Sequence, residues 1–255
     1  MAIVQQSDVA LPLVDEAGLT RACWSCGQPQ ARHFCVSCGK VQPPVAGDYF
    51  EFFGLPRSLN LDTATLEREF YKLSRRLHPD VYARQSATEQ QWSLEKSSQL
   101  NDAYRTLKDP IRRTEYLLGL EGVQLEEQSK AATEKAKASG QEKQQVVPPG
   151  LLEEVFELNM QLEELRMNRQ MGESDPELAK ELEAHKKNLE QKFGELDAEL
   201  KGYWDEWDAL MAREQSGNSL ADRDRHLVRD KMVDLLNRRS YIRNLVRDVN
   251  AALEQ

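Results

Sequence analysis

Residues 61–80 read LDTATLEREFYKLSRRLHPD and combine an amphipathic helix with an abrupt stop. Apolar side chains at helical spacing predict one buried face, made of Leu66, Phe70, Leu73 and Leu77. Asp62 is a favourable N-cap for this helix. Pro79 ends it, because proline fixes its own φ and moves the preceding residue out of the α region. We therefore expect His78 to be extended at the tip of a helical hairpin, with Asp80 beside it.

The opposite face of this helix is cationic and carries Arg68, Lys72, Arg75 and Arg76. A run of charges is most often only a solvated face. Here it ends at the loop that holds His78 and Asp80, in a chain whose net charge is −9. The face is therefore also a candidate docking strip for an acidic partner surface.

Helices are predicted on both sides of this segment. Residues 89–107 form a second long helix, with an apolar stripe of Leu100, Ala103, Tyr104 and Leu107. The two long helices should pack antiparallel, which leaves the tripeptide His78-Pro79-Asp80 exposed at the bend. A short helix capped by Asp48 is expected at 49–54, and Pro110 can start another helix that extends to Leu120.

Every cysteine of the chain falls in one of two C-x-x-C-G repeats, which contain Cys23, Cys26, Cys35 and Cys38. Each repeat lets two thiolates reach one metal from a tight turn, and two repeats complete a tetrahedral sulfur site suited to structural Zn²⁺. The alternatives are a pair of redox dithiols or two disulfides. His33 lies between the repeats, and we expect it to be a bystander because four thiolates already close the site.

Residues 150–255 predict three helical segments joined by short turns, and hence an antiparallel three-helix bundle. The first segment has a seam at alternating spacings of four and three, made of Leu151, Val155, Leu158, Leu162 and Leu165. Asp175-Pro176 starts the second segment. Its seam is Leu178, Leu182, Leu189, Phe193, Leu196, Leu200, Tyr203, Trp207 and Leu210. The turn Ser216-Gly217-Asn218 leads to the last segment, with Leu235, Ile242, Leu245, Val249 and Leu253.

The first bundle segment also carries a second apolar stripe, formed by Leu152, Phe156 and Met160 and bordered by Glu153 and Glu157. The stripe is rotated from the seam by roughly 100–140° at 100° per residue. It either packs on the N-terminal helices or forms an exposed partner site with an acidic rim. The pattern alone favours neither reading.

Composition limits the function classes. The chain has 255 residues, of which 40% are hydrophobic and 30% charged, which suits soluble helical domains. The acidic balance argues against a general nucleic-acid binder. The four histidines are scattered and no phosphate-binding glycine loop is present, which argues against an enzyme. The N-terminus lacks secretory and mitochondrial leader patterns. We expect a cytoplasmic protein, or the mature form of a mitochondrial matrix protein.

Four stretches together resemble a known family. They are DYFEFFGL at 48–55, the tripeptide at 78–80, LNDAYRTL at 100–107 and DPIRRTEYLLGLEG at 109–122. The first three are similar to a J-domain in sequence and in order. The fourth resembles the junction of the HscB family, the J-type co-chaperones of iron–sulfur cluster assembly. That family ends in a three-helix bundle, and some members carry an N-terminal tetracysteine metal domain.

The resemblance implies a mainly α fold with a small zinc-knuckle N-terminal domain, a J-domain helical hairpin and a C-terminal antiparallel three-helix bundle. The expected organisation is a flexible N-terminus at 1–20, a tetracysteine zinc-binding domain at 21–42, a J-domain at 48–122, a linker at 123–149 and a scaffold-binding bundle at 150–255.

The resemblance also implies two partners, with the chain as a non-enzymatic adaptor. The J-domain would bind a DnaK/HscA-type chaperone and stimulate its ATPase through His78, Pro79, Asp80, Lys72, Arg75 and Arg76. The bundle would bind an IscU-type iron–sulfur scaffold through Leu152, Glu153, Phe156, Glu157, Met160 and Tyr241. The metal domain could dimerise the chain or dock a partner. The alternative functions are a general J-domain co-chaperone for unfolded clients and a zinc-ribbon nucleic-acid or assembly module.

Overall fold

The computed structural model describes residues 22–29, 32–123, 125, 148–173, 175–214 and 221–254. Within these ranges the regular structure is helical, apart from two isolated β-bridges in the cysteine repeats, and this confirms the mainly α fold class. The predictions for 1–20, for most of the 123–149 connection and for the turn at 216–218 lie outside the described residues. No helix in the described ranges is both long and apolar enough to cross a membrane.

The chain divides into two compact units. The first unit contains Met1–Arg57 and Leu61–Arg113, and the second contains Ser58–Asn60 and Thr114–Gln255. The cysteine repeats and the predicted hairpin therefore fall in one unit, and the bundle falls in the other.

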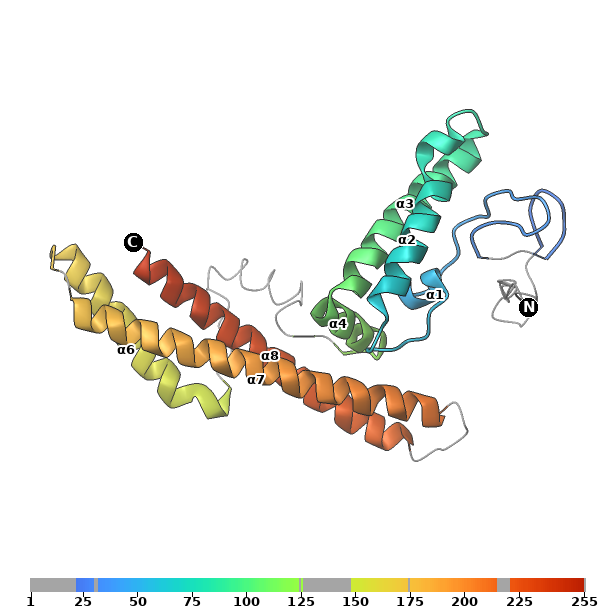
Figure 1. Ribbon diagram of the computed structural model, residues 1–255. Helices are drawn as coiled ribbons and strands as arrows, with labels where there is room; N and C mark the ends of the chain where they lie inside the picture. Colours follow the sequence, from blue (N-terminus) through green and yellow to red (C-terminus); the bar gives the residue numbers. More distant parts are fainter. Residues whose placement is uncertain are drawn as a thin grey trace, which may run out of the picture. The chain divides into compact units, whose positions relative to one another are not determined.

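The first unit is built on α2 (Thr63–Leu77) and α3 (Ala87–Lys108), which pack against each other as a hairpin (Figure 1). Both helices bury apolar side chains, namely Leu66, Leu73 and Leu77 from α2 and Leu100, Ala103 and Leu107 from α3. Phe70 is half-buried and stacks on Tyr104, with ring centroids 4.0 Å apart. The predicted hairpin and its two apolar stripes are confirmed.

Side-chain caps decide where the first helices begin. The carboxylate of Asp48 caps α1 (Tyr49–Phe53), and Gly54 ends it with φ of 67°, a conformation that costs glycine little. Asp62 caps α2 as predicted, because its side chain accepts a hydrogen bond from the backbone of the first turn. These caps satisfy N–H groups that have no partner inside a helix.

The connection after α2 contains a short 3₁₀ helix, η1 (Pro79–Tyr82). α3 then begins earlier than the predicted start at Glu89, because Ser86 and Glu89 form a capping box in which each side chain bonds the other residue's backbone. Asp109 ends α3 and accepts hydrogen bonds from the first N–H groups of α4 (Pro110–Leu120).

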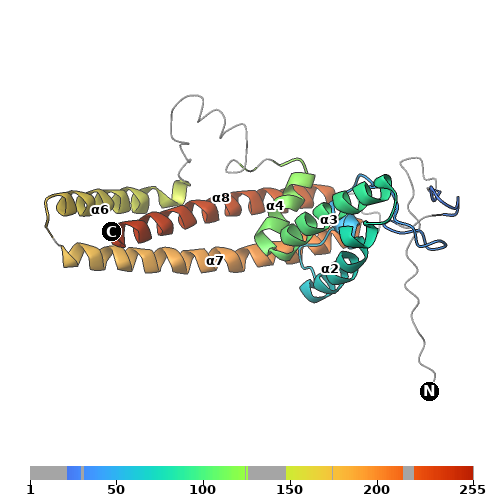
Figure 2. The same ribbon diagram turned by 90° about the horizontal axis from the view of Figure 1, so that it is seen from above.

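The second unit is a three-helix bundle of α6 (Leu152–Gln170), α7 (Pro176–Glu214) and α8 (Ala221–Leu253), preceded by the 3₁₀ turn η2 (Pro149–Leu151). α7 and α8 pack antiparallel over most of their length, and α6 lies beside the N-terminal part of α7 and the C-terminal part of α8 (Figure 2). The predicted bundle is confirmed.

The predicted seams form the core of this bundle. Buried positions include Val155, Leu158, Leu162 and Leu165 of α6, Leu182, Leu189, Leu196 and Trp207 of α7, and Leu235, Ile242, Leu245 and Val249 of α8. Phe193 and Tyr203 are half-buried at the edge of the seam. The guanidinium of Arg239 lies 4.2 Å from the centroid of the Phe193 ring, so a cation covers this edge.

Candidate partner-binding surfaces and metal centre

Three of the hydrogen bonds that hold the loop after α2 do not involve the His78 side chain. The hydroxyls of Ser93 and Ser97 on α3 both donate to the carbonyl oxygen of Leu77, each at 2.7 Å. The Tyr82 hydroxyl donates to the carbonyl oxygen of Arg76 at 3.1 Å. The last carbonyls of α2 therefore have partners, and the loop has a defined frame.

His78 and Asp80 project from this frame. His78 has φ of −59° and ψ of 131°, the extended conformation expected before a proline. Its Nδ1 accepts a hydrogen bond from the backbone N–H of Asp80 at 3.3 Å, and an Asp80 carboxylate oxygen lies 3.5 Å from the same nitrogen. Both side chains are exposed. In the neutral ring, the proton is then on Nε2, which is available as a donor to a partner.

The cations predicted for docking, Lys72, Arg75 and Arg76, are exposed on α2. The Lys72 ammonium lies 3.3 Å from the Glu69 carboxylate on the same helix. The Arg76 guanidinium instead lies over the ring of Phe34, 3.7 Å from its centroid. Arg75 and Arg76 lie in the last turn of α2, which leads into the exposed loop, and Lys72 lies one turn before Arg76.

The two cysteine repeats fold into matching turns. In the first repeat, Cys23 N–H donates to the Gln28 carbonyl and Gly27 N–H donates to the Cys23 carbonyl, at 2.7 and 2.9 Å. The second repeat has the same pair of hydrogen bonds, from Cys35 to Lys40 and from Gly39 to Cys35. Both glycines have φ of 72°, a conformation that strongly favours glycine.

The turns bring the four sulfurs to one point. All four thiols are free, and their Sγ atoms lie within 4.8 Å of one another. The Cys23–Cys38 and Cys26–Cys35 sulfurs are 3.7 and 3.6 Å apart, well beyond the disulfide bond length of about 2.05 Å. The structure therefore does not contain the two disulfides that were one alternative to a metal site. The cluster has the spacing that a single metal ion requires.

The environment of the sulfurs differs within the cluster. Burial raises the pKa of Cys23, but hydrogen bonds from the backbone of Ser25 and Cys26 and from the Gln42 side chain outweigh it and lower the pKa to about 6. A backbone hydrogen bond lowers the pKa of Cys26, whereas burial and the adjacent sulfurs raise it, to about 12 overall. Such a set of sulfurs can ionise together when a divalent cation is among them.

The cysteine turns pack on α3 through side chains at helical spacing. The Lys40 ammonium lies 2.7 Å from the buried Glu89 carboxylate. Trp24 packs edge-on against Trp92, with ring centroids 5.6 Å apart. We call the described residues around the cysteines, 22–29 and 32–42, the cysteine module. One turn further along α3, the buried Lys96 also contacts this module, because its ammonium donates to the backbone carbonyl of Arg32 at 3.0 Å. This packing is not among the contacts predicted from the sequence.

His33 does not lie among the metal ligands. Its Nε2–H donates to the carbonyl oxygen of Phe52 at 2.8 Å, and the two rings are in contact, with centroids 4.5 Å apart. Burial, followed by the charge of Lys96, lowers the pKa of His33 to about 4. The group of described metal-binding side chains contains only the four cysteines, so His33 is a packing residue at this junction.

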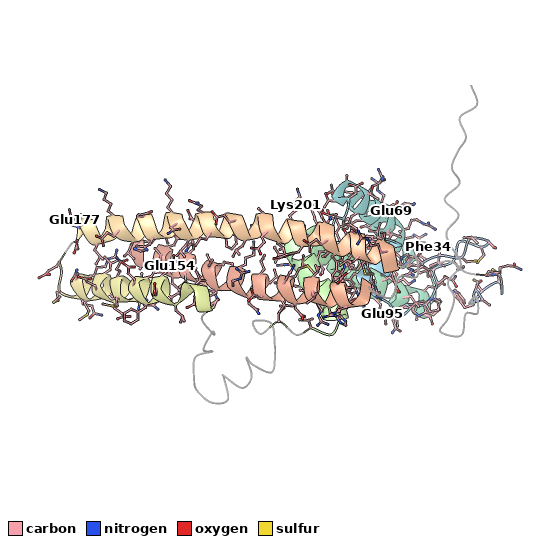
Figure 3. All side chains as sticks on the ribbon, turned by 90° about the horizontal axis from the view of Figure 1, so that it is seen from below. Phe34, Glu69, Glu95, Glu154, Glu177 and Lys201 are labelled. Carbon is pink, nitrogen blue, oxygen red and sulfur yellow. The ribbon has the colours of Figure 1, made fainter. Side chains whose placement is uncertain are left out.

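The second apolar stripe of α6 is exposed. Leu152, Phe156 and Met160 are 55%, 69% and 59% exposed, and Glu153 and Glu157 beside them are also exposed. Glu154, labelled in Figure 3, lies on the same helix and instead pairs with Lys192 of α7. Within the second unit the stripe is therefore an exposed apolar strip with an acidic rim, and its use as a partner site stays a prediction.

Two features of this surface differ from the sequence analysis. The stripe continues at Met167 and Met171, which are also exposed and follow Met160 at helical spacings of seven and eleven. That spacing was visible in the sequence and was missed. Tyr241 on α8 is only 8% exposed, and burial raises its pKa. It is therefore mainly a core residue, with little surface for a partner.

Comparisons with known proteins agree with this geometry. The DnaJ domain family model matches residues 48–116. The co-chaperone protein HscB homolog of Shewanella baltica is 30% identical over 168 residues, which cover 66% of this chain and 86% of that protein. The human iron–sulfur cluster co-chaperone protein HscB is 39% identical over 113 residues, 42% of this chain and 48% of the human protein. The chain thus spans about half the length of that relative. The crystal structure of human HscB has a TM-score of 0.55 and 25% identity, and covers 91% of this chain and 98% of that chain.

Proposed function

The chain belongs to the HscB family of co-chaperones, and from this premise we propose that it is a co-chaperone of iron–sulfur cluster biogenesis. It binds an IscU-type scaffold and stimulates the ATPase of a DnaK/HscA-type chaperone. The observation that carries this proposal is the exposed pair His78 and Asp80, on a loop framed by other residues and placed at the end of a cationic helix.

At the chaperone end, the exposed cations of α2 approach an acidic surface of the ATP-bound chaperone, and charge attraction raises the encounter rate. The framed loop then presents a ring N–H of His78 and the carboxylate of Asp80 to polar groups of the chaperone. Binding favours the chaperone conformation that hydrolyses ATP, so the chain acts through differential affinity for two states of its partner.

At the scaffold end, the exposed stripe of α6 supplies apolar anchors and the adjacent glutamates supply the rim. Exposed aromatic and methionine side chains are the groups that partner surfaces most often bury. We assign Leu152, Glu153, Phe156, Glu157 and Met160 to this contact. Tyr241 belongs to it only through its small exposed edge.

We propose Zn²⁺ as the occupant of the cysteine site. Zinc–sulfur bonds of about 2.3 Å in a tetrahedron separate the sulfurs by about 3.8 Å, close to the two short sulfur pairs of this cluster. Four thiolates leave no open coordination position, so the ion would keep the turns folded. Dimerisation through this module, a cytoplasmic or mitochondrial matrix location, and the domain limits 21–42, 48–122 and 150–255 also remain predictions.

The test of the proposal is His78→Gln in the full chain. We expect this variant to lose stimulation of a DnaK-type ATPase by more than tenfold, because the imidazole is removed while Ser93, Ser97 and Tyr82 still frame the loop. Its melting temperature and its affinity for an IscU-type scaffold should equal those of the unaltered chain. Unchanged stimulation would show that His78 does not have this role.

A scaffold-binding experiment distinguishes the proposed function from that of a general co-chaperone for unfolded clients. Binding of a folded IscU-type scaffold, measured by calorimetry, is expected at the exposed stripe of α6. A chain that binds only chemically denatured polypeptide, and not the folded scaffold, would support the general co-chaperone instead.

A further inference from the structure

Arg76 differs from the other cations of α2 in what holds its side chain. Lys72 pairs with Glu69 one turn away on the same helix, an interaction of a kind that is weak on exposed helix surfaces. Arg76 places its guanidinium over the ring of Phe34, which comes from the cysteine module, with its Cζ 3.7 Å from the ring centroid. Its side chain is therefore oriented by another segment of the chain.

Phe34 is itself rigidly placed. It is buried, forms a β-bridge with Val41, and immediately precedes the metal-site residue Cys35. On its other side, the carbonyl of His33 accepts a hydrogen bond from the backbone N–H of Gln42 at 2.9 Å. The fold of the second cysteine turn therefore sets the position of the ring.

Stacking on an aromatic ring uses the face of a guanidinium and leaves its N–H edges available. These edges form the paired hydrogen bonds by which arginine recognises carboxylates. An arginine that is already oriented also loses less rotamer freedom when a partner binds. In the part of the chain that the structure describes, the Arg76 guanidinium has no hydrogen-bond or ion-pair partner, so Arg76 combines a restrained side chain with unused donors at the end of the helix next to His78.

We infer that Phe34 is a positioning residue for chaperone docking, because it holds the Arg76 guanidinium with its N–H edge ready for an acidic group of the chaperone. This inference rests on the proposed function and adds to it a role for the cysteine module. That module would act on the docking surface through one ring, and a metal ion would act on it by keeping this ring in place.

The test is a double-mutant cycle with the full, metal-loaded chain and a purified DnaK-type chaperone whose ATPase the chain stimulates. The variants are Phe34→Leu, Arg76→Ala and both together, with chaperone affinity measured in ATP. Phe34→Leu should weaken binding by roughly two- to tenfold, the effect of freeing one long side chain. In the Arg76→Ala background it should have no further effect. Additive losses, or no loss from Phe34→Leu, would overturn the inference.

Lys72 provides the matched control. It lies on the same cationic face but pairs with Glu69, so Phe34→Leu and Lys72→Ala should weaken binding independently. Metal content and scaffold affinity are measured for each variant, and both should be unchanged by Phe34→Leu. Coupling of the same size with Lys72 would indicate a general disturbance of α2 and count against the inference.

A second variant keeps the test decisive if Phe34→Leu loses its metal. Arg76→Lys retains the charge and leaves the cysteine module intact, but removes the planar group that stacks. It should weaken chaperone binding nearly as much as Arg76→Ala, whereas full affinity would show that charge alone matters. If neither Arg76→Ala nor His78→Gln changes chaperone binding or stimulation, the proposed function itself fails.

Discussion

Lys96 is a basic side chain that the fold buries. It is buried on α3, its ammonium donates to the carbonyl oxygen of Arg32 at 3.0 Å, and no carboxylate is bonded to it in the described residues. Burial, followed by the charge of Arg32, lowers the pKa of Lys96 from 10.5 to about 7. His33 and Asp48 line the same pocket. The folded state therefore holds this proton less tightly than the unfolded state does.

The sign of the pH dependence follows from this shift. Between pH 7 and 10.5 the unfolded chain binds more protons at Lys96, so the free energy of unfolding should rise with pH, by at most ~1.4 kcal/mol per unit. Lys96→Met removes this contribution, and its lost hydrogen bond adds only a pH-independent offset. Denaturant unfolding of both proteins between pH 7.5 and 9.5 measures the difference. If the free energy of unfolding changes with pH equally in both proteins, Lys96 is not the source of the pH dependence.

Sequence reasoning succeeded for those side chains whose role is local. The extended backbone of His78 follows from the proline after it, and the two C-x-x-C-G repeats predict the convergence of their sulfurs. The contacts of Phe34 and Lys96 were not predicted, because their partners lie far away in the sequence and no spacing pattern indicates such contacts.

Among the packed elements, the cysteine module is an outer support for α3. The Lys40–Glu89 pair, the Trp24–Trp92 contact and the Lys96 hydrogen bond all lie on one stripe of this helix. These contacts require folded cysteine turns, and such turns generally depend on their metal. With a metal ion bound at the four cysteines, the stability of the first unit should therefore depend on that ion, although the cysteines are distant from the hairpin core in sequence.

Chelation of the metal should selectively weaken the first unit. Hydrogen exchange at α3 is expected to become at least tenfold faster after metal removal, and any melting step of this unit should fall by several degrees. Exchange at Leu182 and Leu235 in the bundle should not change. Cys35→Ser, which removes one ligand, should reproduce the effect. Equal protection of α3 with and without metal would mean that the module contributes no support.

The exposed stripe of α6 gives a separate prediction about the scaffold. Phe156 is 69% exposed, so Phe156→Ser should change bundle stability by less than ~0.5 kcal/mol. It should nevertheless weaken binding of an IscU-type scaffold by tenfold or more, as the loss of an aromatic anchor does.

A matched control comes from the same bundle. Leu227 on α8 is 55% exposed, lies on another helix and has no part in the stripe, so Leu227→Ser should leave scaffold affinity unchanged. Calorimetry with the folded scaffold compares the two variants. Equal losses in both would point to a general effect of surface apolar area rather than to a site on α6.

The helices could be predicted from the sequence because each has its own repeat of apolar residues and its own N-terminal cap. Asp62 and Asp109 cap their helices, and the bundle seams repeat at spacings of three and four. The early start of α3 was missed although Ser86 and Glu89 have the spacing of a capping box. The depth of Tyr241 was also missed, because burial depends on how three helices meet.

The chain as a whole carries the two proposed partner sites on two compact units of one polypeptide. The loop with His78 belongs to the first unit and the stripe with Phe156 to the second. If delivery of a scaffold to a chaperone is the function, both partners must be bound by the same molecule. Covalent linkage then raises the effective concentration of the scaffold near the chaperone, typically to the millimolar range for a short connection.

This requirement predicts that two half-defective chains cannot help each other. His78→Gln still binds the scaffold and Phe156→Ser still binds the chaperone, so an equimolar mixture contains both sites, but never on one molecule. Scaffold-dependent stimulation of the chaperone ATPase should therefore stay below a tenth of the value for the unaltered chain. Adding His78→Gln in excess to the unaltered chain should inhibit, because it occupies scaffold unproductively. Restoration of activity by the mixture would show either that the two sites act independently or that the chains pair, and light scattering would distinguish these cases.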